Sequence, residues 1–446
     1  MIVMKFGGSS VADAQRIRHV IGIAKDHLER KPVLVLSAMG DTTDFLLEAG
    51  NAALHEGKID VEKIEKHLLD TIKKLRLPAS AGKEIIALME ELKRLLSGIS
   101  LIRELTPRTK DFLVSFGERF SVRIAAAYCK TQGIKAEAFD AWDLGFLSDS
   151  NHTSAELARE SWKLIPEKIL PLVNKGIMPV VTGFIAKDSA GNITTLGRGG
   201  SDLTATMIAA ACKADEAQVW KDVDGILTAD PRIVAKAKPV DSVTFEEASE
   251  LAYFGAQVLH PRAMQPCIQT GTPVRVKNSY NFSAPGTRIT AALDKKSLPV
   301  RAITFRRDVT LVDIVSTRML GQYGFLAEVF SCFARHKISV DMLATSEVSV
   351  SLTVDSSQDL SLIKKELSRI ASVDIKAEKA IITIVGNVKR SSEILARAFR
   401  ICQLIGVTVQ MVSQGASKVN ISFIVNGSEA VDVVKALHLD YFPELS

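Results

Sequence analysis

The feature that most constrains this fold is the regular alternation of short apolar runs with longer amphipathic stretches over about the first 290 residues. Three clear apolar runs are residues 32–36, 178–181 and 218–220. Runs of this kind are typical of strands buried on both faces of a largely parallel sheet, and the amphipathic stretches between them are typical of covering helices. The sequence therefore predicts an α/β fold for this part of the chain.

Residues 57–105 interrupt this alternation with a stretch rich in Leu, Ile, Lys and Glu at helical spacing. Such a stretch predicts amphipathic helices inserted between two strands. They could form a lid over a site or a cap on one side of the domain. Solvated helices are the simpler account, and we prefer it.

A glycine-rich segment, Thr-Leu-Gly-Arg-Gly-Gly-Ser-Asp at residues 195–202, has the composition of an anion site. Glycine lets backbone N–H groups come close to a ligand, and Arg198 offers a two-pronged donor to a carboxylate or phosphate. Ser201 or Asp202 is expected to cap an apolar helix that begins at Leu203. Taken alone, such a segment is more often a structural turn than a site.

The N-terminus carries a second glycine turn. Residues 2–4 are apolar, and Lys5, Phe6, Gly7, Gly8 and Ser9 follow them. A lysine at the carboxyl end of a strand lies where open α/β sheets bind ligands, so we favour a binding role over a solvent-exposed charge. The chain contains neither G-x-x-x-x-G-K-[ST] nor G-x-G-x-x-G, which disfavours Walker-type NTPases and dinucleotide enzymes.

Charge and cysteine content exclude other classes of protein. The 56 basic and 51 acidic residues are interspersed without a basic run, which suits small anionic substrates and argues against nucleic acid. The five cysteines have no C-x-x-C pair, so we expect reduced thiols and neither disulfides nor zinc ligands. No apolar run reaches about 18 residues, so no membrane partner is expected. We expect a cytoplasmic protein, or the mature form of an organellar one.

Four motifs occur in an order that resembles one family. They are KFGGSSV at residues 5–11, FGE at 116–118, the Arg198 loop and KDVDG at 221–225. Together they resemble the amino-acid kinase family, and within it the aspartokinases, over nearly the whole chain. The resemblance implies ATP-dependent phosphorylation of the L-aspartate side chain to 4-phospho-L-aspartate, the first step of lysine, threonine and methionine biosynthesis. It also implies Mg2+ held mainly by the ATP phosphates, with no metal ligand from the protein.

The C-terminal part contains a weak repeat after a polar segment at residues 278–287, which we interpret as an interdomain linker. The first copy comprises strand 311–315, helix 324–336 and strands 338–342 and 348–352. The second comprises strand 381–385, helix 392–404 and strands 407–411 and 419–423. These βαββ units resemble the paired ACT domains of aspartokinases, of the α+β class. The resemblance implies an amino-acid kinase domain at 1–290, a lysine-sensing ACT unit at 301–375 and an assembly unit at 376–446, which residues 301–307 may join.

The resemblance assigns roles to individual residues. Lys5 is the phosphoryl clamp, and Asp202 orients it. The residues implied for aspartate are Ser9, Thr43, Glu118, Arg198 and Ser201, with Glu118 on the ammonium and Arg198 on the α-carboxylate. The residues implied for ATP are Lys5, Gly7, Gly8, Lys221, Asp222, Leu227, Arg232 and Gln257. From the sequence pattern alone, Glu118 is equally a helix first-turn acid, and the turn at 230–232 is equally structural.

Two positions depart from the family pattern. Many members have Thr where this chain has Lys221, and Lys where it has Gln257, so Lys221 could replace the missing cation. A catalytically silent amino-acid sensor with the kinase fold therefore remains an alternative. An enzyme of the same superfamily acting on glutamate or a nucleotide monophosphate is disfavoured, because the FGE motif and the paired ACT units accompany aspartokinases.

The first ACT unit resembles the effector site of lysine-inhibited aspartokinases. The residues implied for lysine are Met319, Gln322, Phe325, Leu326, Ser339, Val340, Asp341, Ser346 and Glu347. Backbone groups near Phe325 suit a carboxylate, and the acids Asp341 and Glu347 suit ammonium groups. The alternative is a dimer-forming sheet with exposed acids. The resemblance also implies a homodimer, or a dimer of dimers, assembled through the ACT units.

Overall fold

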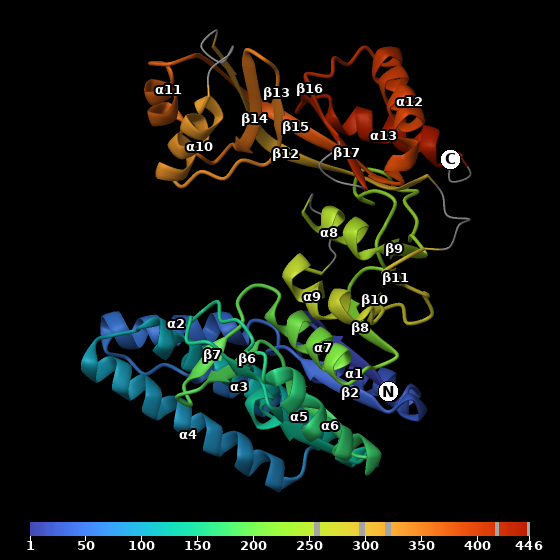
Figure 1. Ribbon diagram of the computed structural model, residues 1–446. Coiled ribbons are helices and arrows are strands. Elements are labelled where there is room, and N and C mark those ends of the chain that lie inside the picture. The colour runs from blue at the N-terminus through green and yellow to red at the C-terminus, as the bar shows by residue number, and fades with distance from the viewer. Residues whose placement is uncertain (254–258, 294–298, 317–322, 415–418, 444–446) are drawn as a thin grey trace. The chain divides into compact units, whose positions relative to one another are not determined.

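The computed structural model describes residues 1–253, 259–293, 299–316, 323–414 and 419–443. The chain forms two compact units (Figure 1). The first contains Met1–Ile226, Asp241–Phe245 and Leu259–Leu293, and the second contains Leu227–Val240, Glu246–Val258 and Asp294–Ser446. Residues 227–240 and 246–258, which the sequence pattern assigns to the first domain, thus cluster with the C-terminal part of the chain.

An eight-stranded sheet with the order β3-β5-β2-β1-β8-β10-β11-β9 is the centre of the first unit. Every neighbouring pair is parallel except β10 with β11, so the predicted α/β fold is confirmed. The strands are β1 Ile2–Phe6, β2 Pro32–Leu36, β3 Ala136–Phe139, β5 Met178–Thr182, β8 Glu216–Lys221, β9 Ser242–Thr244, β10 Val274–Asn278 and β11 Thr287–Thr290.

Helices cover the sheet on both sides. Along β1, the buried side chains of Ile2, Met4 and Phe6 join the core formed with α1 and α5, and Lys5 points to the side of α7 because strand side chains alternate between faces. The helices of the first unit are α1 Ala14–Asp26, α2 Thr42–Glu56, α3 Glu62–Leu75, α4 Ala79–Ile102, α5 Pro107–Thr131, α6 Ser161–Asn174, α7 Gly200–Ala211 and α9 Pro261–Thr270. Short 3-10 turns are Gly8–Val11, Leu28–Arg30 and Ala141–Leu144.

The predicted helical insertion is present as α3 and α4. Helix α4 packs on α2 and α5, and buried leucines and isoleucines of both inserted helices belong to the same core as the sheet. Their outer faces are solvated, as the preferred interpretation expects. The first unit also contains a three-stranded sheet of β4 Leu147–Ser148, β6 Ile185–Asp188 and β7 Ile193–Thr195, and β7 leads directly into the Arg198 loop.

The segment at residues 278–287 is not an interdomain linker. It is the connection between β10 and β11, which pair antiparallel with Val276 opposite Thr287. Its polar, glycine- and proline-containing composition reflects this turn. Sequence composition does not distinguish a hairpin turn from a linker, because both need residues that tolerate irregular backbone.

The second unit is built on a six-stranded antiparallel sheet with the order β13-β14-β12-β15-β17-β16. The strands are β12 Val300–Val315, β13 Leu343–Thr345, β14 Ser349–Asp355, β15 Ser372–Gly386, β16 Met411–Ser413 and β17 Asn420–Asn426. The first half of β12 pairs with the second half of β15, so residues 302–306 lie beside residues 381–385. Register shifts after Arg306 separate this half from the rest.

Helices pack on this sheet in two separate cores. Helices α10 Phe325–Arg335 and α11 Ser361–Leu367 pack beside Val312 and Ile314, and helices α12 Ser391–Leu404 and α13 Ala430–Tyr441 pack beside Val300 and Ile303. Helix α8 is Phe245–Tyr253, and a 3-10 turn spans Val388–Arg390. Within the described residues, no helix has the length and apolar character needed to cross a membrane.

The predicted strands at residues 338–342 and 407–411 are wrong. The observed strands β13 and β16 begin at Leu343 and Met411, and helices α11 and α13 were not predicted. Ile338 and Met342 are apolar because they are buried in the core, and not because they lie in a strand. Strand pairing begins only after them, at Leu343. All five cysteines are buried, and none of them is paired in a disulfide.

Candidate active site

Lys5 lies at the carboxyl end of β1, between the parallel strands β2 and β8. Its Nζ is 2.7 Å from Asp202 Oδ1 on α7, and both side chains are about nine-tenths buried. A Cβ added at Gly7 would lie 3.7 Å from this ammonium, an ordinary contact distance, so the glycine turn lies directly beside the Lys5 side chain. The pair places a compact positive charge at the edge of the sheet where ligands bind in this fold class.

Helix α7 begins at Gly200, three residues before the predicted start. Its N-cap is Gly199 at φ 74°, and within the described residues no side chain caps it, so the predicted cap by Ser201 or Asp202 is wrong. Glycine at this position adopts a left-handed backbone without steric cost. Asp202 therefore lies in the first turn, where it pairs with Lys5.

Glu118 lies on α5 and is 4% exposed. Its Oε1 accepts a hydrogen bond of 3.1 Å from the Ala38 N–H, while Oε2 is buried without a hydrogen-bond partner among the described residues. Burial raises the pKa of this carboxyl to about 8, against the opposing effect of the Ala38 N–H. Neighbouring Gly117 permits this approach, because a Cβ there would lie 2.8 Å from the Ala38 Cβ. An incoming cation would supply the missing partner of Oε2.

These groups open into one cavity of about 350 Å3. Among the predicted residues, those lining it are Lys5, Gly8, Thr43, Glu118, Ser201 and Asp202. Ser37, Ala38, Gly40, Phe184, Gly197, Gly199 and Gly200 complete the wall. The cavity thus combines a lysine, two buried acids and several glycine backbones, a donor and acceptor set suited to a small zwitterion beside a phosphate.

Arg198 and Ser9 lie at exposed positions. Arg198 stands between Gly197 and Gly199, which both line the cavity, and its guanidinium makes no hydrogen bond or ion pair within the described part of the chain. It is therefore available to a ligand, although it is not itself part of the cavity wall.

Asp111 supports this site from outside the cavity wall, and the sequence pattern does not identify it. It lies on α5, two helical turns before Glu118, and is 1% exposed. Its carboxylate accepts hydrogen bonds from Thr195 Oγ1 at 2.6 Å and from the Thr153 N–H at 3.0 and 3.1 Å, and His152 Nδ1 lies 2.9 Å from Oδ2. Thr153 has φ 70°, a strained value for a β-branched residue that these contacts support. Asp111 thus fixes the strand end that leads into the Arg198 loop.

Arg262 holds the same loop from α9. Its guanidinium donates to the carbonyl oxygens of Leu196 at 3.1 Å and Ala155 at 2.6 Å. The only sequence signal for such residues is a charged side chain in a predicted helix. That signal does not identify the loop to which the charge binds.

Lys221 ends β8, the strand beside β1, and its pKa is lowered chiefly by burial and also by the charge of Lys5, while Asp202 opposes the shift. Its carbonyl accepts from the N–H and hydroxyl of Ser279. Asp222 is exposed. Leu227 and Arg232 belong to the second unit, where Arg232 pairs with Asp230 at 2.6 Å. Gln257 lies outside the described residues.

The predicted effector residues lie at the start of α10, in the connection between α10 and β13, and in the β13–β14 turn. Asp341 is already engaged, because its carboxylate pairs with Arg306 at 3.0 Å and accepts from Tyr253 Oη at 2.7 Å. Glu347 is exposed in the turn. Phe325 and Leu326 begin α10, Ser339 and Ser346 are exposed, and Val340 is half-buried. Met319 and Gln322 lie outside the described residues.

Comparison with known proteins gives consistent matches. The model of the amino acid kinase family matches residues 1–278, and an ACT domain model matches residues 312–359 and 382–441. The chain is 50% identical to aspartokinase 1, chloroplastic, of Arabidopsis thaliana, over 99% of this chain and 80% of that protein. Its sequence is 34% identical to that of Escherichia coli aspartokinase III in the crystal structure of the complex with lysine and aspartate. The two structures superpose with a TM-score of 0.83, with 99% of each chain covered. The complex of that enzyme with aspartate and ADP gives 32% identity and a TM-score of 0.78, over 99% of this chain and 100% of that one.

Proposed function

Because this chain belongs to the amino acid kinase family and, within it, to the aspartokinases, we propose that the cavity around Lys5 brings the side chain of L-aspartate to the γ-phosphate of ATP. In this reaction a carboxylate oxygen forms a bond to the γ-phosphorus, and the bond from that phosphorus to the β,γ-bridging oxygen breaks. The products are 4-phospho-L-aspartate and ADP. The observation that carries the proposal is the buried Lys5–Asp202 pair beside the unpaired oxygen of Glu118.

Each end of the amino acid has a partner of suitable charge. Glu118 Oε2 receives the ammonium, and Arg198 receives the α-carboxylate through its planar fork, which a lysine lacks. Thr43 and Ser201 in the cavity wall orient the substrate, and Ser9 borders it. An aspartate carboxyl has an ordinary pKa of about 3.9, so the nucleophile is ionised at neutral pH and needs no general base.

The catalytic contribution of the protein is then electrostatic. Lys5 neutralises charge that builds on the transferring phosphoryl group, and Asp202 fixes the position of the ammonium. Gly7 and Gly8 allow phosphate oxygens to approach the backbone. Mg2+ is carried in on the ATP phosphates, and Lys221, at the end of the neighbouring strand, contributes a second cation on the nucleotide side.

The Lys5→Ala variant tests this assignment. We expect kcat to fall by roughly 10² or more with a much smaller change in the aspartate KM, because a phosphoryl clamp acts mainly in the transition state. Activity is measured as ATP-dependent formation of aspartyl hydroxamate in the presence of hydroxylamine. The matched control is Lys25→Ala, at an exposed position on α1. A Lys5→Ala variant within threefold of wild type refutes the role of Lys5, and a wild-type chain without hydroxamate formation supports a silent amino-acid sensor instead.

We further propose that lysine inhibits this enzyme by binding the first ACT unit, which assembles the chain into dimers or dimers of dimers. This rests on the similarity to an enzyme solved with lysine and on the exposed carboxylate of Glu347 in the β13–β14 turn. Because Arg306 already pairs with Asp341, Glu347 is the acid more available to a ligand ammonium. Asp341 can bind the ligand only if its ion pair with Arg306 breaks.

The Glu347→Lys variant tests the regulatory proposal. Reversing this charge is expected to weaken lysine inhibition by roughly 30-fold or more, while uninhibited activity stays nearly unchanged. The control is Asp432→Lys, an exposed acid on α13. Inhibition that is competitive with aspartate and survives Glu347→Lys places the inhibitor in the active site and refutes the proposal.

A further inference from the structure

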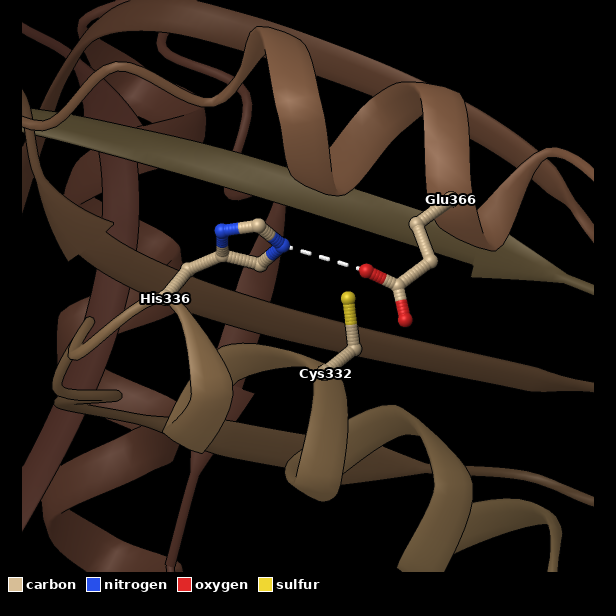
Figure 2. Close-up of side chains that lie close together, drawn as sticks. All are labelled: Cys332, His336 and Glu366. Carbon is tan, nitrogen blue, oxygen red and sulfur yellow. Dashed lines mark hydrogen bonds and ion pairs between the residues drawn. The ribbon is translucent and has the colours of Figure 1, made fainter.

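Three potential metal ligands meet where α10 and α11 pack in the second unit. Cys332 and His336 lie four residues apart at the end of α10, and Glu366 faces them from α11 (Figure 2). Residues four apart on a helix project from the same face, so the thiol and the imidazole point together. The Cys332 sulfur, an imidazole nitrogen and a Glu366 oxygen all lie within 4.8 Å of one another.

The spacing of two of these atoms already matches a metal site. His336 Nε2 lies 3.1 Å from Glu366 Oε2. In a tetrahedral site with bonds of about 2.0 Å to nitrogen and oxygen, those two ligands are about 3.3 Å apart. A metal could therefore be held by these two side chains with almost no change of position. The sulfur would be about 3.5 Å from each of them in such a site, so it needs a shift of at most about 1.3 Å to complete the set.

The surroundings of the cluster also suit a bound metal. Arg335 donates to the other carboxylate oxygen of Glu366, Oε1, so the carboxylate is oriented from behind and Oε2 remains directed at His336. Such outer hydrogen bonds typically fix the ligands of protein metal sites. Cys332 is 1% exposed, whereas the side chains of His336 and Glu366 are 27% and 34% exposed. The cluster is thus anchored on its inner side and open to solvent on its outer side.

We propose that Cys332 Sγ, His336 Nε2 and Glu366 Oε2 bind a divalent cation of the zinc class, with water as the fourth ligand. The combination of sulfur, nitrogen and oxygen donors favours Zn2+ or Co2+ over Mg2+ or Ca2+, which prefer oxygen alone. On binding, the Cys332 thiol releases its proton to solvent, and the hydrogen between His336 Nε2 and Glu366 leaves for solvent or for Nδ1. Bonds from Nε2 and Oε2 to the metal then replace the His336–Glu366 hydrogen bond. The metal would join α10 to α11 within the first ACT unit. This site is independent of the kinase reaction, and it revises the expectation that no cysteine binds zinc.

Metal titration of the full chain tests the proposal. The protein is stripped with a chelator, passed into chelator-free buffer and titrated with Co2+ while the thiolate-to-cobalt absorption band is recorded, and Zn2+ is then added to displace the Co2+. We expect one equivalent to bind with a thiolate band. The melting temperature should rise with Zn2+ but not with an equal excess of Mg2+.

Two variants and a matched control separate this site from other thiols. Cys332→Ser and His336→Gln should each weaken Zn2+ binding by at least roughly tenfold, and Cys332→Ser should abolish the thiolate band. Cys402→Ser, at the buried cysteine of α12 in the other core of the same sheet, should behave as wild type. Cobalt binding without a thiolate band, or undiminished Zn2+ binding by His336→Gln, shows that the cluster is only an ion-pair link between two helices. His336→Gln gives this answer even if Cys332→Ser does not fold.

Discussion

Replacing Glu118 by glutamine tests how the cavity recognises the substrate ammonium. The amide keeps the size of the side chain and can still accept the Ala38 N–H, but it removes the charge. A hydrogen bond to a charged group contributes about 1.5 to 3 kcal/mol, which corresponds to roughly a 10- to 100-fold increase in the aspartate KM of the variant. The full increase in the aspartate KM is expected only at a pH at which Glu118 is ionised in the free wild-type enzyme.

The pKa of about 8 makes the effect depend on pH. At pH 7, ionising a group with that pKa costs about 1.4 kcal/mol. The ratio of the aspartate KM of Glu118→Gln to that of wild type should therefore be roughly tenfold smaller at pH 7 than at pH 8.5. The aspartate KM of wild type should fall as the pH rises from 6.5 to 8.5, because the carboxylate that binds the ammonium becomes populated. The KM of Glu118→Gln should be nearly constant over this range.

The same pKa makes an independent prediction for stability. An acid whose pKa is higher in the folded state than its ordinary value of 4.5 stabilises the fold most below pH 4.5, and this contribution is lost as the pH rises to about 8. Glutamine does not titrate. Between pH 6 and 8 the unfolding free energy of ligand-free Glu118→Gln should therefore rise relative to that of wild type by up to about 2 to 3 kcal/mol. The melting temperature of the variant should rise relative to that of wild type over the same range.

Initial rates at saturating ATP and pH 6.5, 7.5 and 8.5, together with thermal unfolding at pH 6 and 8, provide both measurements. The control is Glu137→Gln at an exposed position on β3, where neither quantity should change. An aspartate KM for Glu118→Gln equal to that of wild type at pH 8.5 would refute the assignment of the ammonium to Glu118. A stability difference independent of pH would refute the raised pKa.

Three further outcomes test the rest of the site. Arg198→Lys should raise the aspartate KM roughly tenfold or more, because the planar fork is lost, and a rise in the ATP KM alone would move this residue to the nucleotide side. Asp111→Asn should raise the aspartate KM several-fold with the ATP KM unchanged, because Thr195 loses its charged acceptor, and unaltered kinetics in a destabilised variant would show a purely structural role. Lys221→Thr should raise the ATP KM roughly tenfold in the native background and have little effect alongside Gln257→Lys, and additive effects in this double-mutant cycle would refute the compensation.

The sequence alone was sufficient for those features that depend on local pattern. Short apolar runs predicted the strands of the parallel sheet because strands covered on both faces are apolar over most of their length. The position of Lys5 between an apolar run and two glycines predicted its place at the edge of that sheet, and the order of the motifs predicted the family. These properties are encoded in neighbouring residues, so they can be read without knowledge of distant contacts.

Tertiary structure decided everything that depends on which distant residues meet. The helix start at Gly200, the hairpin at residues 278–287 and the shifted strands near Ile338 and Met411 follow from packing and pairing that composition does not specify. The same holds for Asp111 beneath the Arg198 loop, 84 residues from its partner Thr195. Glu366 likewise meets Cys332 and His336 only because α11 packs on α10. The polar groups of a side chain are set by its own chemistry, whereas its partners, and through burial its charge, are set only when the chain folds.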